Sequence, residues 1–406
     1  MLGDEVLDLR AFSRRLVRAG PALRARGARR TAEAIAVACS ALLEPRAALG
    51  RAFRRELLAS TGLSAPAIEW GLDTTLRTWN VDEAVALLAA APSEPGAPPA
   101  LAAIVLAGNV FTAGLRAIAL PLTAGVPVIA KGSSADDVLP RYLAKALHRA
   151  DADVGTAFKV VTFARGDVAL EATLLGHADI VSVHGDDDTV ATLRARAPAH
   201  ARFLAHGHGL GIAYVATGVL TSEASALAVA ERVALDVAAY DQRGCLSPHA
   251  VIVDQGAAVS PARFAELLAD VALAQLEPRL PRGEVPTDAL AAQAQWRGVA
   301  LARGVLHAGA RWAVSFEDAH VLRASPGHRN VGVYTGRGPD ALAARIAPFA
   351  SHVKALGVAG ADAASPVLAA LAPYVCAAGA MQTPPLAAHL DGLQPFEGFA
   401  RRAVTD

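Results

Sequence analysis

Apolar residues recur at helical spacing through the first part of the chain, from about residue 5 to residue 90, where Ala, Leu, Arg and Glu dominate. This periodicity predicts a series of helices. Residues 60–64 (STGLS) interrupt the pattern, and Ser64 is suited to cap the next helix because its hydroxyl can accept a hydrogen bond from the first turn. A proline-rich stretch, residues 92–99 (PSEPGAPP), then predicts a connector.

Beyond the connector the pattern changes to short apolar runs that end in glycine or polar residues. Four of them occur in succession: 101–109 (LAAIVLAGN), 123–134 (TAGVPVIAKGSS), 158–167 (FKVVTFARGD) and 178–187 (ADIVSVHGDD). Helical segments such as 138–150 lie between them, and this alternation predicts a parallel, doubly wound sheet. Ligands bind to such sheets at the carboxyl ends of the strands, which is where Asn109, Lys131 and Gly185 fall.

A second series of strands and helices follows. We expect a fifth apolar strand at 211–218, after a histidine–glycine segment, and a helix at 222–237. The next loop holds Cys245 and leads into another apolar strand. The chain is therefore predicted to be an α/β protein with two doubly wound lobes. The expected division is a helical segment at 1–91, a first lobe at 100–219, a second lobe at 220–376 and a tail at 377–406 that returns to the first lobe or to an oligomer interface.

The composition argues against several classes of protein. Hydrophobic residues make up 53% of the chain and charged residues 19%, which is typical of a globular protein. Lys+Arg and Asp+Glu are equal at 38 each, so nucleic acid is not an expected partner, and the zero net charge favours association. The N-terminus has no apolar signal core, and Asn, Gly, Arg and Pro interrupt the most apolar region, so no transmembrane segment is predicted.

The three cysteines, Cys39, Cys245 and Cys376, are far apart in sequence and form no Cys-x-x-Cys pair. A disulfide scaffold and a cysteine zinc site are therefore not expected, and reduced thiols fit the cytoplasm. Cys245 lies in a polar loop, DQRGCLSPH, between a helix and a strand. It is either a small buried apolar residue or a nucleophile beside Arg243, in a cationic or helix-end environment that lowers its pKa.

The strand-end residues also allow two interpretations. Asn109 is either a turn residue or an amide donor that faces a developing oxyanion. Lys131 is either a solvated turn residue or, together with Ser133 and Ser134, a contact for the ribose or phosphate of a nucleotide. Neither a G-x-G-x-x-G fingerprint after a strand nor a P-loop occurs, so a dinucleotide would have to bind in another way.

Two further polar segments complete the set. His206 and His208 are separated by one glycine, and no carboxylate or cysteine cluster adjoins them in sequence, so we predict no metal site. The acidic run at 186–188 is most simply the N-terminus of a helix, where carboxylates complement the helix dipole.

Taken together, these segments resemble the aldehyde dehydrogenase superfamily and, more closely, its LuxC-type acyl-CoA reductase branch, from about residue 30 to the end. The matching segments are STGLSAPAIEWGLDTTLRTW, LAGNVF, VPVIAKGSS, ADIVSVHGDDDTV, YDQRGCLSPH, SPGHRNVGVY and HLDGLQPFEGFARR. The resemblance implies that Cys245 is the nucleophile and Asn109 the oxyanion donor. It also implies that Lys131 binds the cofactor ribose and that Gly185 lies near the cofactor phosphates. The first lobe would then be the cofactor domain and the second the catalytic domain.

The chain departs from the superfamily pattern in two places. Oxidising members carry a Glu-Leu-Gly-Gly-Lys stretch whose glutamate activates water, whereas this chain has HGHGLG. That loss favours a reductase, because an activated water would hydrolyse a cysteine-bound acyl group. A Gly-Ser turn has become Gly-Asp-Asp-Asp, which is unfavourable near a cofactor 2′-phosphate, so a preference for NADPH is implied by the branch and not by these residues.

The resemblance implies a cytoplasmic, NADPH-dependent reductase that converts a long-chain fatty acyl-CoA to a fatty aldehyde through an acyl-cysteine thioester, with CoA as leaving group. His206 or His208 would handle protons or line the pocket. We expect a homo-oligomer, with an acyl-transferring protein as a further partner. One alternative is reduction of a short or carrier-bound acyl group, and another is a noncatalytic nucleotide-binding or scaffold protein on the same fold.

Overall fold

The structure is a computed structural model, and it describes residues 8–92, 94–133, 137–319 and 321–402. Five helices precede the first sheet: α1 (Leu9–Arg26), α2 (Ala28–Leu43), α3 (Ala48–Thr61), α4 (Ala65–Thr75) and α5 (Val81–Ala90). Ser64 caps α4 by accepting a hydrogen bond from the backbone N–H of Ala67, as predicted. The helical opening segment and the break at 60–64 are thus confirmed.

The first lobe is built on a five-stranded, wholly parallel sheet with the order β4-β3-β2-β5-β6. Its strands are β2 (Ala102–Val105), β3 (Val128–Lys131), β4 (Phe158–Val161), β5 (Ile180–His184) and β6 (Arg202–His206). The helices between them are α6 (Ala113–Thr123), α7 (Val138–Ala150), α8 (Ala152–Thr156), α9 (Val168–Leu175) and α10 (Asp187–Arg196). Strands β3 and β5, which flank the central strand β2, are almost wholly buried, because helices cover both faces of the sheet.

The second lobe holds a seven-stranded sheet with the order β13-β12-β7-β8-β11-β10-β9, in which only β9 runs antiparallel to its neighbour. Its strands are β7 (Leu210–Val215), β8 (Pro248–Asp254), β9 (Val305–Ala308), β10 (Ala313–Glu317), β11 (Asn330–Gly336), β12 (Val353–Ala359) and β13 (Tyr374–Ala377). Its α-helices are α11 (Glu223–Ala238), α12 (Pro261–Glu266), α13 (Ala274–Leu276), α14 (Thr287–Arg303), α15 (Pro339–Ile346) and α16 (Pro366–Ala369).

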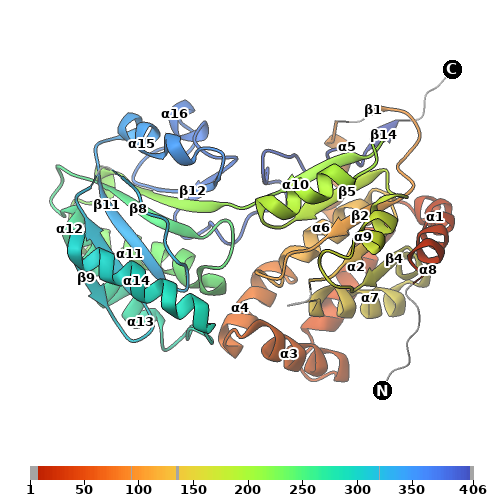
Figure 1. The fold of residues 1–406 in the computed structure, drawn as a ribbon, viewed down its shortest axis with the longest axis horizontal. Coiled ribbons are helices and arrows are strands. Elements are labelled where there is room, and N and C mark those ends of the chain that lie inside the picture. Colours follow the sequence, from red (N-terminus) through yellow and green to blue (C-terminus); the bar gives the residue numbers. More distant parts are fainter. Residues whose placement is uncertain (1–7, 93, 134–136, 320, 403–406) are drawn as a thin grey trace.

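Short helical turns complete this lobe: η1 (Thr217–Val219), η2 (Ala239–Gln242), a π-helical turn η3 (Leu267–Leu273) and η4 (Ala347–Phe349). Figure 1 shows the two lobes side by side, with α3 and α4 below the space between them. The predicted α/β class with two lobes and a helical opening segment is therefore what the structure has.

Two details differ from the sequence prediction. Strand β6 was not predicted, because four of its five residues are only half-buried and a polar side chain stands at each end, Arg202 and His206. Strand β7, which we placed in the first lobe, pairs with β8 and β12 of the seven-stranded sheet. The change from one sheet to the other therefore comes before Leu210, and the boundary predicted at 219/220 is wrong by one strand. A local pattern cannot show which of two parallel sheets a strand joins.

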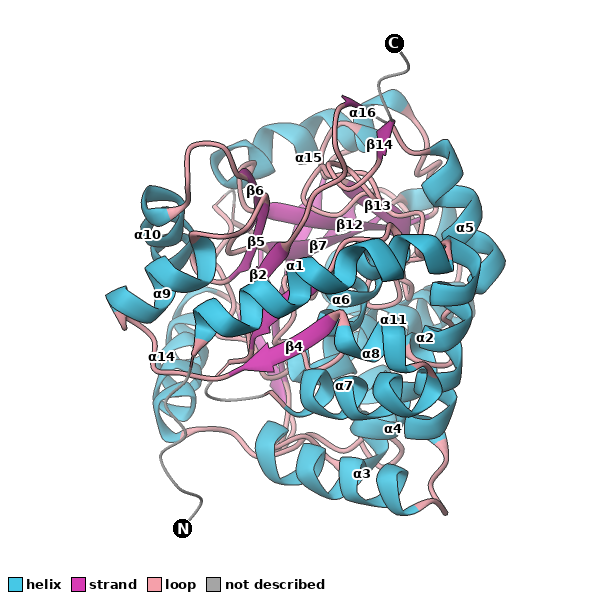
Figure 2. Ribbon diagram, turned by 90° about the vertical axis from the view of Figure 1, so that its right-hand side faces the viewer, coloured by secondary structure: helices cyan, strands magenta, loops and turns pink. Residues whose placement is uncertain are grey.

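The C-terminal tail crosses back from the second lobe to the first. Arg116 of α6 donates hydrogen bonds to the carbonyl oxygens of Pro385 at 3.1 Å and Ala388 at 2.6 Å. Arg202 pairs with Glu397 at 2.7 Å, and Phe399 is buried in the core of the first lobe. The short strands β1 (Glu94–Pro95) and β14 (Arg401–Arg402) then join the tail to the connector (Figure 1; β14 is also labelled in Figure 2). The tail thus lies over the space between the lobes.

Candidate active site

A cavity of about 1240 Å³ opens between the two lobes and the tail. Every described residue that the sequence analysis nominated lines it: Asn109, Lys131, Ser133, Gly185, His206, His208 and Cys245. Ser134 lies outside the described residues. The nominated side chains come from the ends of β2, β3, β5 and β6 and from the turn before β8, so the parallel topology brings one edge of the first sheet against the Cys245 turn.

The turn that presents Cys245 begins with three consecutive residues in the left-handed region, Tyr240, Asp241 and Gln242, with φ of 49°, 52° and 59°. Such backbone is costly for residues with a side chain and persists only where the surroundings hold it. The Gln242 amide does so by donating to the carbonyl oxygens of Pro248 and Asn330, both at 2.8 Å.

Asp241 is held equally firmly. Its carboxylate pairs with the buried guanidinium of Arg329 at 2.7 Å and accepts a hydrogen bond from the Gly283 N–H at 2.9 Å. Tyr240 is buried, and its hydroxyl lies 2.8 Å from that of Thr112 in the first lobe. These long-range contacts hold the strained turn, and with it the position of Cys245.

Cys245 is exposed to the cavity, and the protein around the cavity desolvates its thiol. Burial raises the pKa of Cys245 to about 11; the nearby Asp391 carboxylate adds to the rise, and Lys354 opposes it. Arg243 is not among the groups that shift this pKa, and Lys354 is the cation that lowers it, although the net shift is upward. Arg243 instead donates hydrogen bonds to the carbonyl oxygens of Thr61 at 2.9 Å and Tyr240 at 3.2 Å.

Asn109 lies in the loop after β2 and is tied to the same turn. Its Nδ2 donates a hydrogen bond to the carbonyl oxygen of Arg243 at 2.9 Å. The residue is not among those with positive φ, so a left-handed turn does not explain its presence. One amide N–H anchors the side chain beside the Cys245 turn, and the second can reach a ligand in the cavity.

Lys131 ends β3 with its side chain largely buried, and burial lowers the pKa of its ammonium group. The ammonium lies 5.0 Å from the centre of the Phe163 ring, and none of the described residues accepts a hydrogen bond from it. Gly185 follows β5, where a Cβ atom would come within 3.1 Å of the Thr189 side chain in the first turn of α10. The backbone at Gly185 therefore lies close to the start of that helix.

The acidic run caps α10, as predicted. Asp186 accepts a hydrogen bond from the Thr189 N–H at 2.7 Å, and the hydrogen bonds from Thr189 lower its pKa. Its carboxylate also pairs with Arg165 at 3.2 Å. The Asp187 carboxylate lies 3.1 Å from His352 Nε2. Asp186 is therefore compensated by Arg165 and by a helix N–H group, and Asp187 accepts a hydrogen bond from the backbone N–H of His208 at 3.0 Å.

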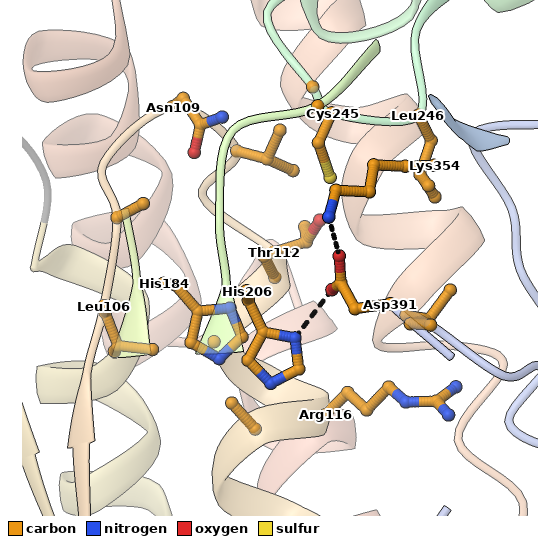
Figure 3. Close-up of a pocket in the computed structure, with 18 of the residues that line it drawn as sticks. Leu106, Asn109, Thr112, Arg116, His184, His206, Cys245, Leu246, Lys354 and Asp391 are labelled. Atoms are coloured by element: carbon orange, nitrogen blue, oxygen red, sulfur yellow. Dashed lines mark hydrogen bonds and ion pairs between the residues drawn. The ribbon is translucent and has the colours of Figure 1, made fainter. Parts of the chain in front are cut away.

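His206 and His208 have separate surroundings. The His206 ring stacks on His184 with centroids 4.1 Å apart, and its Nδ1 lies 2.7 Å from Asp391 of the tail (Figure 3). His208 lies near His352, with ring centroids 6.1 Å apart. Of these two histidines, only His206 belongs to the group of polar side chains that lies beside Cys245.

Sequence analysis missed two residues of that group, Lys354 and Asp391, which pair at 2.8 Å. Each carried a weak signal: a lysine inside the apolar strand VKALGVA, and an Asp-Gly pair typical of a tight turn. Neither signal indicates a position beside Cys245.

Comparison with known proteins identifies the family. The family model described as acyl-CoA reductase (LuxC) matches residues 69–402. The chain belongs to this LuxC family. A curated relative of this LuxC-family protein is long-chain acyl-protein thioester reductase 2 of Photobacterium leiognathi, which is 29% identical over 146 residues. That match covers 35% of the chain and only 30% of the relative's length.

Solved structures show that the LuxC-family chain has the aldehyde dehydrogenase fold. A salicylaldehyde dehydrogenase from Pseudomonas putida G7 superposes with a TM-score of 0.73 at 14% identity, over 97% of this chain and 88% of that one. An NAD-dependent benzaldehyde dehydrogenase from Corynebacterium glutamicum gives 0.71 at 15% identity, over 91% and 85% of the two chains. Among the described residues of this LuxC-family chain, no helix is long and apolar enough to cross a membrane.

Proposed function

We propose that this LuxC-family protein reduces a thioester-linked fatty acyl group to the aldehyde through a covalent acyl-Cys245 intermediate. The observation that carries the proposal is the Asn109 amide, anchored at 2.9 Å to the turn that presents Cys245, at a large cavity between two lobes. A nucleophile and a fixed amide donor at one cavity form the minimum set for acyl transfer. The substrate we propose is a long-chain fatty acyl-CoA.

The chain's own groups suit the acylation half of the reaction. The Cys245 thiolate attacks the acyl carbonyl, and the bond between the carbonyl carbon and the CoA sulfur breaks with CoA leaving as thiolate. The oxyanion that forms in between is stabilised by the Asn109 amide and by the backbone N–H of Cys245. The left-handed turn at 240–242 fixes these groups in advance, so little reorganisation accompanies the reaction.

The cavity has room and polarity for a nicotinamide dinucleotide and an acyl chain together. Its volume of about 1240 Å³ exceeds the roughly 300–1000 Å³ of most small-molecule pockets. The Lys131 ammonium, without a hydrogen-bond acceptor among the described residues, fits a ribose hydroxyl or phosphate oxygen, and Ser133 and Gly185 line the same end. When bound, the reduced cofactor supplies the hydride. Arg165 beside Asp186 makes a 2′-phosphate acceptable there, so NADPH is the cofactor we propose.

Apolar side chains suit the acyl chain. Leu106, Leu115 and Leu120 contribute to the wall from the first lobe, and Leu390 and Leu393 contribute from the tail. We propose a cytoplasmic location, a homo-oligomer and an acyl-transferring partner protein as the setting of this reaction. The name of the Photobacterium relative favours a second candidate substrate, an acyl group carried on a protein.

Intact-protein mass spectrometry after exposure to acyl donors, without reductant, tests the function. The donors are palmitoyl-CoA, butyryl-CoA and a palmitoylated carrier protein. We expect a stable mass increase of one palmitoyl group from palmitoyl-CoA and none in Cys245→Ala. Labelling from the carrier protein alone would replace the CoA substrate with the second candidate. No labelling from any donor would overturn the acyl-enzyme mechanism.

A further inference from the structure

Lys354 occupies an irregular position in strand β12. The pairing with β7 shifts between Val353 and Ala355, so Lys354 is the extra residue of a β-bulge. A bulge redirects the side chain that it carries, and bulges concentrate beside active sites. The Lys354 side chain is only 14% exposed, although its neighbours in β12 are apolar. The bulge therefore turns a lysine from a buried strand toward the cavity.

Gly209 provides the space in which Lys354 lies. A Cβ atom at position 209 would fall 2.0 Å from Lys354 Cγ and 2.7 Å from its Cε, which is far inside van der Waals contact. Any side chain at this position would displace the lysine from its present path. The position of Lys354 therefore requires a glycine at 209, the second glycine of the HGHGLG segment. The sequence pattern alone does not reveal this requirement.

Asp391 supplies the counter-charge from the tail. Asp391 and Gly392 have φ of 56° and 78°, and they form the tip of a tight turn between Leu390 and Leu393. The Asp391 side chain is 12% exposed and pairs with Lys354 at 2.8 Å and with His206 at 2.7 Å. Its burial opposes ionisation, but His206 and Lys354 together lower its pKa below the usual value. Asp391 is thus an ionised group that bridges two basic side chains.

Figure 3 shows the Cys245 thiol beside the end of the Lys354 side chain, whose ammonium group points toward Asp391. We propose that Lys354, placed by the β12 bulge and by Gly209, is the cation that stabilises the Cys245 thiolate during catalysis. This inference rests on the proposed acylation of Cys245. Lys354 would thus stabilise the Cys245 thiolate, which Arg243 does not do.

The step at which this charge matters most is release of the aldehyde. In the hemithioacetal oxyanion the carbonyl double bond reforms, the carbon–sulfur bond breaks, and its electron pair goes to Cys245 Sγ. The thiolate that appears there has no proton, and burial disfavours it. Lys354 acts as a positive charge beside this sulfur atom. The same thiolate then attacks the next acyl thioester, and the released CoA thiolate takes a proton from water.

The other titratable groups around Cys245 are bound elsewhere. His206 contacts Asp391, and His184 lies stacked beneath it with a pKa well below the usual value because of burial. His208 lies beside His352, and His249 Nδ1 lies 3.1 Å from the carbonyl oxygen of Ser325. Asp391 and Lys354 are therefore the charges that act on the thiol.

The test is the pH dependence of iodoacetamide alkylation at Cys245 in the full chain, followed by mass spectrometry of the Cys245 peptide. An opposite charge close to a titrating group shifts its pKa by about 1–3 units. Lys354→Met should therefore slow alkylation at pH 8 by about tenfold or more. Gly209→Ala should slow it in the same sense with both charges retained, whereas Lys354→Arg should alter it little.

Lys145→Met is the matched control, because Lys145 is exposed on α7 and does not line the cavity. Circular dichroism of each variant verifies folding. An unchanged alkylation profile in folded Lys354→Met protein would overturn the inference, and so would faster alkylation. This outcome is distinguishable from failure of the proposed function, because acylation of the wild-type protein by palmitoyl-CoA is scored separately.

Discussion

The two walls of the cavity are built in different ways. On the first-lobe side, Asn109, Lys131 and Gly185 follow the ends of parallel strands, and regular topology places them at one edge. On the second-lobe side, Cys245 follows a strained turn and Lys354 sits in a bulge, and the tail adds Asp391 in a left-handed conformation. We call the first-lobe side the regular wall and the side formed by the second lobe and the tail the irregular wall. The regular wall suits binding of an extended ligand, whereas the irregular wall concentrates the charges that act on one sulfur atom. Strain and bulges are thus confined to the side where bonds change.

The largest effect should come from the irregular wall. Cys245→Ala should abolish both acylation and reduction while the thermal unfolding temperature changes little, because the residue faces the cavity and contributes little packing. Reductase activity equal to that of the wild type would end the assignment. Cys376→Ala is the control: this half-buried thiol packs beside Tyr374, and we expect any loss there to reflect stability.

Asn109 lies where the two walls meet, and its removal should be the next largest effect. Loss of one oxyanion donor costs about 100- to 1000-fold in turnover. Asn109→Ala should therefore lower kcat by about that factor with little change in the dissociation constant of the cofactor, measured by fluorescence titration. A change confined to cofactor affinity would show that Asn109 binds the cofactor and does not stabilise the oxyanion.

Substitution of Lys131 tests the regular wall, and it should affect cofactor binding and not the chemistry at Cys245. A hydrogen bond to a charged group contributes about 1.5–3 kcal/mol, so Lys131→Met should weaken NADPH binding by roughly 10- to 100-fold. The alkylation rate of Cys245 should not change, because Lys131 does not act on the thiol. Comparing the loss for NADPH with that for NADH shows whether Lys131 and Arg165 recognise the 2′-phosphate. Slower alkylation in this variant would show that the two walls are coupled.

The smallest expected effect is that of Asp391→Asn. The Asp391 carboxylate raises the pKa of Cys245, so its neutralisation should lower that pKa from about 11 and increase the thiolate fraction at every pH below it. We expect alkylation at pH 8 to become several-fold faster, the opposite of the result for Lys354→Met. Slower alkylation would mean that Asp391 acts mainly by holding Lys354.

Sequence patterns were sufficient for most of the regular wall. Strands β2, β3 and β5 were predicted from short apolar runs, and parallel topology then required their polar ends to meet. The helix after Ser222 was predicted at 222–237 and is observed at Glu223–Ala238, with Ser222 as its cap. These features depend on local spacing and on one general rule of sheet topology. The assignment of β7 to the second sheet could not be predicted, because both sheets accept the same apolar strand.

The sequence by itself determined the fold class, the LuxC resemblance and the nomination of Cys245, Asn109 and Lys131, because short-range patterns and motif residues carry that information. Only the tertiary structure decided the electrostatics at Cys245. Residues 185 apart in the chain, His206 and Asp391, meet there at 2.7 Å, and a lysine from a bulged strand joins them. Desolvation and Coulomb interactions depend on everything packed around the sulfur atom. The adjacent Arg243, which the sequence pointed to, therefore mattered less than Lys354, more than a hundred residues away.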